Sequence, residues 1–158
     1  MLVSKILQEI HPLDLRRDLV AYSGMVDFAG TRCQCDLSSW TLTPEQLIHW
    51  VESKHVCLVE LLPTIRDAIA HWLPTNVYCN LEMPVDVATL LDGIYIEHIY
   101  YRHNEDPRYR HPHGTTIEIM SNLRKNIDNE RDQSCLSMVD IKVTLDENLT
   151  IRRIYCDG

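Results

Sequence analysis

Apolar residues in the first part of the chain recur at helical spacing. One run has apolar positions three or four residues apart: Val3, Ile6, Leu7 and Ile10. It predicts a helix that ends at His11-Pro12. A second run at similar spacing consists of Leu15, Leu19 and Tyr22. It predicts a short helix that ends at Ser23-Gly24.

Residues 25–37 alternate instead, which predicts two strands that turn at Ala29-Gly30. The clearest helix start follows at Thr43-Pro44-Glu45-Gln46, where Thr43 caps and Gln46 completes a capping box. We expect this helix to break at Lys54-His55, and a further helix to begin at Pro63 and end at Pro74. A short strand over 77–81 and a small helix over 84–92, ended by Gly93, complete this part.

From residue 94 onward, apolar residues recur at every second position. Strands are predicted at 94–103, 115–120, 137–145 and 149–155, and the last two are joined by a turn at Asp146-Glu147-Asn148. In the third of these strands one face is apolar: Val139, Ile141, Val143 and Leu145. The other face carries Asp140, Lys142 and Thr144. This pattern predicts a sheet with one side on a core and the other in water.

These elements predict an α+β fold with N-terminal helices packed on one face of a curled antiparallel sheet, formed mainly by the C-terminal half. We expect one globular domain over 1–158, with 1–93 mainly helical with short strands and 94–158 in antiparallel strands. The order of elements over the last ~65 residues resembles the cone-shaped fold of nuclear transport factor-like and cystatin-like domains. No family motif accompanies this likeness, so it implies no residue roles.

Charge narrows the classes of partner. The chain of 158 residues has a net charge of −8, and this acidic field repels phosphate backbones and membrane surfaces. We therefore expect no nucleic-acid or membrane partner, and the field favours a basic protein. An acidic balance that serves solubility alone is the alternative.

Cysteine usage indicates a compartment. The six cysteines form no CxxC pair, and Cys33 and Cys35 lie on one side of their predicted strand. The N-terminus lacks the apolar stretch of a signal peptide, and no run reaches about 18 apolar residues. These features predict a cytoplasmic protein with free thiols.

A histidine-rich window is the first candidate for chemistry. His98, His103, His111 and His113 lie among acidic residues, and imidazole with carboxylate suits zinc and related metals. His98 and His103 differ by an odd number, however, and point to opposite faces of one strand. We expect a polar loop rather than a metal site, with His111 and His113 as weak metal candidates, and no cofactor.

Tyrosine and arginine concentrate in the same window. The predicted partner-binding residues are Tyr95, Tyr100, Tyr101, Arg102, Arg108, Tyr109 and Arg110. Such residues can stack on bases, but a small basic patch in an acidic chain would bind nucleic acid weakly. Tyr and Arg are also enriched at protein interfaces. A solvated loop is the first interpretation of this window, a protein interface the second and nucleic-acid binding the third.

Enzyme signatures are weak. The chain has no GxSxG, GxGxxG or P-loop motif, and the calcium-like run that begins at Asp128 has Gln133 where glycine is required. By strand parity Glu118 and Asp140 face water, whereas His98 shares parity with Ile94, Ile96 and Tyr100. His98 is therefore the catalytic candidate if the protein is an enzyme.

Elimination leaves a non-catalytic, acidic protein-binding module as the expected function. In its specific form it is an inhibitor or immunity-type protein that neutralises a basic partner such as a toxin. The alternative is a small-molecule-binding protein or enzyme with a pocket between helices and sheet. Homodimer formation is compatible with either.

Overall fold

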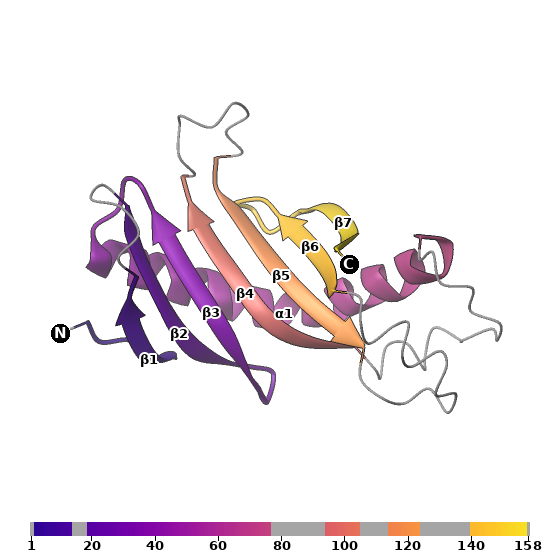
Figure 1. Ribbon diagram of the computed structural model, residues 1–158, viewed down its shortest axis with the longest axis horizontal. Coiled ribbons are helices and arrows are strands. Elements are labelled where there is room, and N and C mark those ends of the chain that lie inside the picture. The colour runs from indigo at the N-terminus through magenta and orange to yellow at the C-terminus, as the bar shows by residue number, and fades with distance from the viewer. Residues whose placement is uncertain (1, 14–18, 77–93, 105–113, 124–139, 158) are drawn as a thin grey trace.

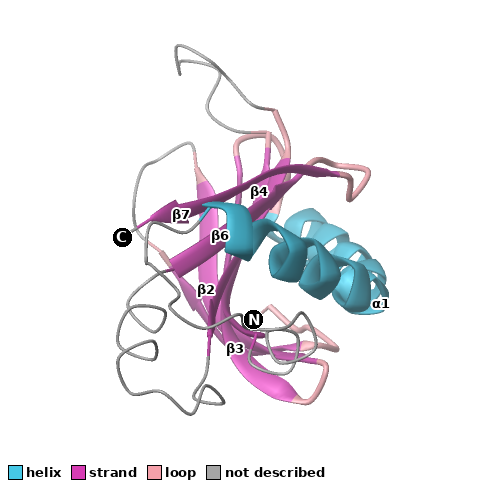
Figure 2. Ribbon diagram, turned by 90° about the vertical axis from the view of Figure 1, so that its right-hand side faces the viewer, coloured by secondary structure: helices cyan, strands magenta, loops and turns pink. Residues whose placement is uncertain are grey.

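A computed structural model describes residues 2–13, 19–76, 94–104, 114–123 and 140–157. Its elements, in chain order, are β1 (Leu7–Pro12), β2 (Val20–Phe28), β3 (Thr31–Ser39), α1 (Pro44–Asn76), β4 (Ile94–His103), β5 (Thr116–Leu123), β6 (Asp140–Leu145) and β7 (Ile151–Asp157). The strands form one sheet in the order β1-β2-β3-β4-β5-β6-β7, antiparallel except for the parallel pair β3–β4 (Figure 1). The helix covers one face of this sheet (Figure 2).

The predicted fold class is wrong, because the described structure has a single helix in place of several and one seven-stranded, mostly antiparallel sheet. β1 and β2 stand where two helices were expected, and the sheet takes three of its seven strands from before α1. In β2 the residues toward α1 alternate with period two, as Val20, Tyr22, Val26 and Phe28 show. Gly24 occupies the middle of that series and hides the period, because it adds no apolar side chain to the pattern.

Gly24 also allows β1 to approach β2 closely. The pairing of β1 with β2 shifts register between Gln8 and His11, and Glu9 there has φ 53°. A Cβ atom on Gly24 would lie 2.9 Å from the carbonyl oxygen of Gln8, too close for an ordinary contact. The irregular edge of the sheet thus depends on a residue without a side chain.

The β2–β3 hairpin is confirmed. Phe28 pairs with Thr31, so Ala29 and Gly30 form a two-residue turn with φ values of 52° and 85°. Positive φ at both positions matches a type I′ turn, whose twist suits adjoining strands. Asp27 Oδ1 accepts a hydrogen bond of 2.8 Å from the Gly30 N–H.

The capping box at the start of α1 is also confirmed. The Thr43 N–H donates to Gln46 Oε1 at 3.0 Å, and the Gln46 N–H donates to Thr43 Oγ1 at 3.3 Å. These two bonds satisfy backbone donors that the first turn leaves free, so the helix begins at Pro44.

The predicted break at Lys54-His55, the new helix start at Pro63 and the stop at Pro74 are wrong, because α1 runs through all of them. Its buried positions form one unbroken stripe: Leu47, Val51, His55, Leu58, Leu62, Ile65 and Ile69. His55 is a member of that stripe, and Pro63 lies on the exposed side. Burial of the stripe against the sheet outweighs the hydrogen bond that Pro63 cannot donate.

The C-terminal strands follow the predicted parity. Ile117, Ile119, Ile141 and Val143 are buried toward α1, and Glu118 lies on the opposite face. The expectation that Glu118 faces water is wrong, because neighbouring side chains on that face cover it and leave it only 9% exposed. The pairing of β4 with β5 shifts register between Ile96 and His98, which places one extra residue, Glu97, in β4. This bulge reverses the facing of every residue that follows it.

Several predictions fall outside the described residues: the strand over 77–81, the helix over 84–92, and the segments that contain Cys79, Gln133 and Cys135. Within the described residues, Cys33 and Cys35 are free and buried on the α1 side, as predicted from their spacing. Burial raises the pKa of the Cys33 thiol to about 12. No described helix has the length and apolar character needed to cross a membrane.

Candidate binding surface on the outer sheet face

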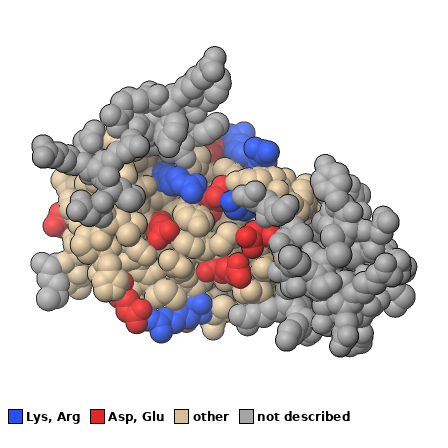
Figure 3. Space-filling model, viewed as in Figure 1, with Lys and Arg blue, Asp and Glu red and all other residues tan. Residues whose placement is uncertain are grey.

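The sheet has an outer face, here defined as the face that α1 does not cover, and it is polar and charged (Figure 3). Its side chains come from the positions that alternate with the buried ones: Ser23, Arg32 and Asp36; Tyr95, His98, Tyr100 and Arg102; Thr116 and Glu118; Asp140, Lys142 and Thr144; Arg153 and Tyr155. Acidic and basic groups both occur on this face, so neighbouring strands can pair their charges.

Three residues of β4 stack on one another along the outer face. The ring centroids of His98 and Tyr100 lie 4.0 Å apart with an interplanar angle of 9°. The Arg102 guanidinium carbon lies 4.7 Å from the centroid of the Tyr100 ring. This ladder of alternate residues is a direct result of the strand period, and each ring restricts the rotamers of the next.

A carboxylate on β3 anchors one end of the ladder. His98 Nε2 lies 2.9 Å from Asp36 Oδ2, with both side chains largely covered. The hydrogen bond from His98 is the main reason that the pKa of Asp36 is lowered, and Ser23 adds a second hydrogen bond. Burial and the charge of Asp36 raise the pKa of Tyr100. A hydrogen-bonded network thus runs from Ser23 on β2 through Asp36 on β3 to His98 on β4.

Glu118 on β5 holds the other end. Its Oε2 accepts a hydrogen bond of 2.7 Å from the Tyr155 hydroxyl, and its Oε1 lies 3.8 Å from Arg102 Nη2. The Arg153 guanidinium carbon lies 4.5 Å from the centroid of the Tyr155 ring. Burial and the bond to Glu118 raise the pKa of Tyr155, so its hydroxyl remains a donor at neutral pH.

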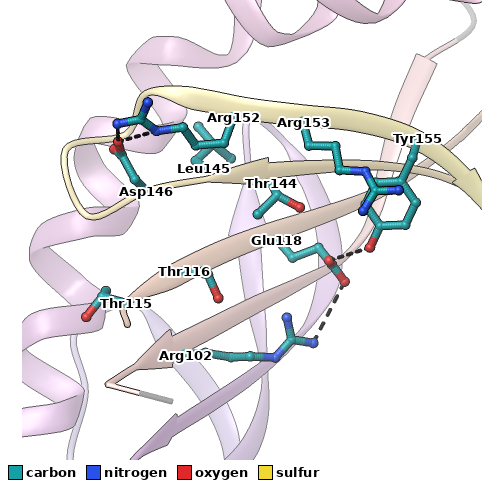
Figure 4. Close-up of a pocket in the computed structure, with 10 residues that line it drawn as sticks. All are labelled: Arg102, Thr115, Thr116, Glu118, Thr144, Leu145, Asp146, Arg152, Arg153 and Tyr155. Carbon is teal, nitrogen blue, oxygen red and sulfur yellow. Dashed lines mark hydrogen bonds and ion pairs between the residues drawn. The ribbon is translucent and has the colours of Figure 1, made fainter. Parts of the chain in front are cut away.

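A groove of about 530 Å³ opens beside Glu118 (Figure 4). It is lined by Arg102, Thr115, Thr116, Glu118, Thr144, Leu145, Asp146, Arg152, Arg153 and Tyr155. Arg152 forms an ion pair with Asp146 at the β6–β7 turn, where its Nε and Nη2 lie 2.8 and 2.6 Å from Asp146 Oδ2. The groove therefore combines hydroxyl groups with three guanidinium groups and two carboxylates.

The structure divides the predicted partner-binding residues. Tyr95, Tyr100 and Arg102 lie on the outer face, where the Tyr95 hydroxyl donates to Glu97 Oε1 at 2.8 Å. Tyr101 is fully buried on the α1 side and cannot meet a partner at the surface. Arg108, Tyr109 and Arg110 lie outside the described residues.

His98, predicted to share a face with Ile94 and Ile96, lies on the opposite face. The bulge at Glu97 moves it to the outer face beside Tyr100. There its Nε2 is bonded to Asp36 and its ring is stacked, and the structure shows no nucleophile paired with it among the described residues. The arrangement therefore gives His98 a role in ordering this surface.

His103 belongs to another cluster. Its Nδ1 lies 3.0 Å from Ser39 Oγ, and its ring meets Trp50 edge to face at 5.1 Å. Ser39 Oγ also accepts from the Thr41 and Leu42 N–H groups, so its own proton is donated to His103. In the described ranges no three His, Cys, Asp or Glu side chains are grouped to hold a metal ion, and His111 and His113 lie outside those ranges.

Sequence reasoning missed Asp36, Arg153 and Tyr155 as members of this surface. The signal for Arg153 and Tyr155 was their spacing of two on the final strand, which places an arginine and a tyrosine on one face. Asp36 gave no such signal, because the parallel pairing of β3 with β4 that brings it to His98 follows from tertiary structure.

Comparisons with known proteins found no matching family model, no matching curated protein and no matching solved structure.

Proposed function

We propose that this protein is a non-catalytic binding module whose partner is another protein that docks on the outer face of the sheet. The observation that carries the proposal is the stacked ladder His98–Tyr100–Arg102 in the middle of that face. Tyr and Arg dominate the binding energy of many protein interfaces. The sheet displays them here from strands rather than from loops.

The ladder is ordered before any partner arrives. Tyr100 is held between His98 and Arg102, and these are in turn held by Asp36 and Glu118. Side chains that are already restricted lose less conformational entropy on binding than free ones do. A rigid aromatic and guanidinium surface of this kind supports protein recognition.

Charge supports a basic partner. The net charge of −8 attracts a positively charged protein over the distance of a Debye length, which speeds encounter. The specific form we propose is an inhibitor or immunity-type protein that neutralises a basic partner such as a toxin. Carboxylates on this side of the molecule, which include the exposed Asp27 and the half-buried Glu97, would meet that partner's cations.

The alternative of a pocket between helix and sheet receives no support from the described residues. The α1 stripe packs directly on the sheet, and Leu58, Ile65, Ile99 and Ile117 there are fully buried. The groove that the structure does show lies on the outer face.

Affinity capture tests the proposal with matched variants. Wild-type protein is immobilised beside Tyr100→Ala, Arg102→Ala and the control Val56→Ala, which alters an exposed residue of α1. We expect one stoichiometric basic protein on the wild type and on Val56→Ala, and its loss from both outer-face variants. Equal capture by all four proteins, or no stoichiometric protein on the wild type, would refute the proposal.

A further inference from the structure

Two guanidinium groups in the groove have hydrogen-bond donors that the described residues do not use. Arg153 is stacked on Tyr155, and no described carboxylate pairs with it. Arg102 is stacked on Tyr100 and forms an ion pair with Glu118, but the 3.8 Å between Arg102 Nη2 and Glu118 Oε1 is too long for a hydrogen bond. Both are therefore positioned by their flat faces, and within the described residues no hydrogen bond uses the N–H groups on their edges.

The two groups approach the groove from different strands. Arg102 comes from β4 and Arg153 from β7, with the strand that carries Glu118 between them in the sheet (Figure 4). Threonine hydroxyls from Thr115, Thr116 and Thr144 line the same space. Guanidinium forks are groups that proteins use to bind carboxylates and phosphates.

The charge of the groove has the opposite sign to that of the chain. Three arginines and two carboxylates line it, which gives a local charge of +1 within a protein of net charge −8. Its volume of about 530 Å³ is within the range of small-molecule sites. The Glu118 carboxylate in the same groove can accept a hydrogen bond, so a hydroxyl or amine on the ligand would also find a partner.

We propose that this groove is a binding site for a small molecule that carries a carboxylate or phosphate group, held between Arg102 and Arg153. The site goes beyond the proposed protein interface and does not depend on it. Glu118 favours ligands that also carry a hydrogen-bond donor, as monohydrogen phosphate and citrate do.

The test follows the arginine Nε–H resonances by ¹⁵N NMR while inorganic phosphate or citrate is added at constant ionic strength. We expect saturable shifts of Arg102 and Arg153 below about 10 mM anion. Saturation by phosphate assigns a phosphate-bearing ligand, and saturation by citrate a carboxylate-bearing one. Arg153→Gln should weaken binding by about tenfold or more, because it removes a charge-assisted contact.

The control is Arg32→Gln. Arg32 lies on the same outer face but is already paired with Glu9 at 2.6 Å, so its loss should leave the affinity unchanged. Shifts that do not saturate, or that respond equally to Arg153→Gln and Arg32→Gln, would overturn the proposal. An acidic peptide that binds where both small anions fail would overturn it as well, and would return the groove to the protein interface.

Discussion

The Nδ1 atom of His55 lies 2.9 Å from the hydroxyl oxygen of Tyr101, which joins the middle of α1 to β4. His55 Nε2 lies 2.8 Å from the carbonyl oxygen of Asp27. A carbonyl oxygen can only accept, so Nε2 carries the ring proton and Nδ1 accepts from Tyr101. Both nitrogens of a buried imidazole are thus satisfied, and the ring is neutral.

Substitution Tyr101→Phe should lower the free energy of unfolding by about 1–3 kcal/mol, because it leaves His55 Nδ1 buried without a donor. Urea unfolding followed by circular dichroism measures this change. The control Tyr100→Phe removes a hydroxyl from the outer face and should change stability by less than about 0.5 kcal/mol. Equal effects of the two substitutions would contradict the assigned hydrogen bond.

Acidification should destabilise the protein through the same histidine. Burial lowers the pKa of His55 below its usual 6.5, so the unfolded chain binds a proton at a higher pH than the folded chain does. The stabilising contribution is complete above pH 6.5 and is lost as the pH falls from there toward the lowered value.

The measurement is the free energy of unfolding at about pH 7.5 and about pH 5.5. The wild type should lose more stability between these values than His55→Gln does. The pKa of His103 is also lowered by burial, against the opposing charge of Glu147, so His103→Gln should reduce the pH dependence in the same direction. An identical pH dependence in all three proteins would show that neither ring is held neutral by the fold.

Ala29→Asn should stabilise the β2–β3 hairpin by about 0.5–1 kcal/mol, because Ala29 has φ 52° and asparagine tolerates that conformation better. Ala29→Val should have the opposite effect, since a β-branched residue is strained there. Thermal unfolding of both variants checks the order. A lower midpoint for Ala29→Asn than for the wild type would rule out the type I′ turn.

Pro63→Ala should raise the free energy of unfolding by about 1–3 kcal/mol. Residue 63 lies inside α1 and is exposed, so alanine would supply the missing N–H to the carbonyl of Val59 without disturbing the core. The neighbouring exposed substitution Thr64→Ala serves as the control and should change stability by a few tenths of a kcal/mol. A loss of stability in Pro63→Ala would mean that the helix requires a bend at this position.

Gly24→Ala should destabilise the protein by about 1–3 kcal/mol, because its Cβ would lie 2.9 Å from the Gln8 carbonyl oxygen and β1 would have to move. Hydrogen exchange at β1 amides, compared with those of β6, localises the effect. Gly24 does not have a positive φ, so the substitution tests this contact without an added backbone cost. Protection of β1 equal to that of the wild type would contradict the close approach.

Local signals predicted local structure well. The capping box at Thr43, the turn at Ala29-Gly30 and the parity of Glu118 each depend on a few neighbouring residues, and all three are confirmed. The predicted break at Lys54-His55 is wrong, because His55 is buried within the stripe of α1. Its burial depends on Tyr101 and Asp27, which are far away in sequence.

The site depended on two features that parity alone cannot supply. One extra residue in β4 moved His98 to the outer face, and a bulge of this kind leaves no clear mark in the pattern of apolar residues. The parallel pairing of β3 with β4 then placed Asp36 beside it. Sequence reasoning therefore singled out Tyr100 and Arg102 but not Asp36, which is bonded to His98 beside them.

Because strand order in the sheet equals strand order in the chain, β1 and β7 form its two borders. Trimming the chain from either terminus would therefore remove border strands one at a time and leave every interior pairing intact. By the same geometry, a fusion at either terminus would emerge next to a border of the sheet.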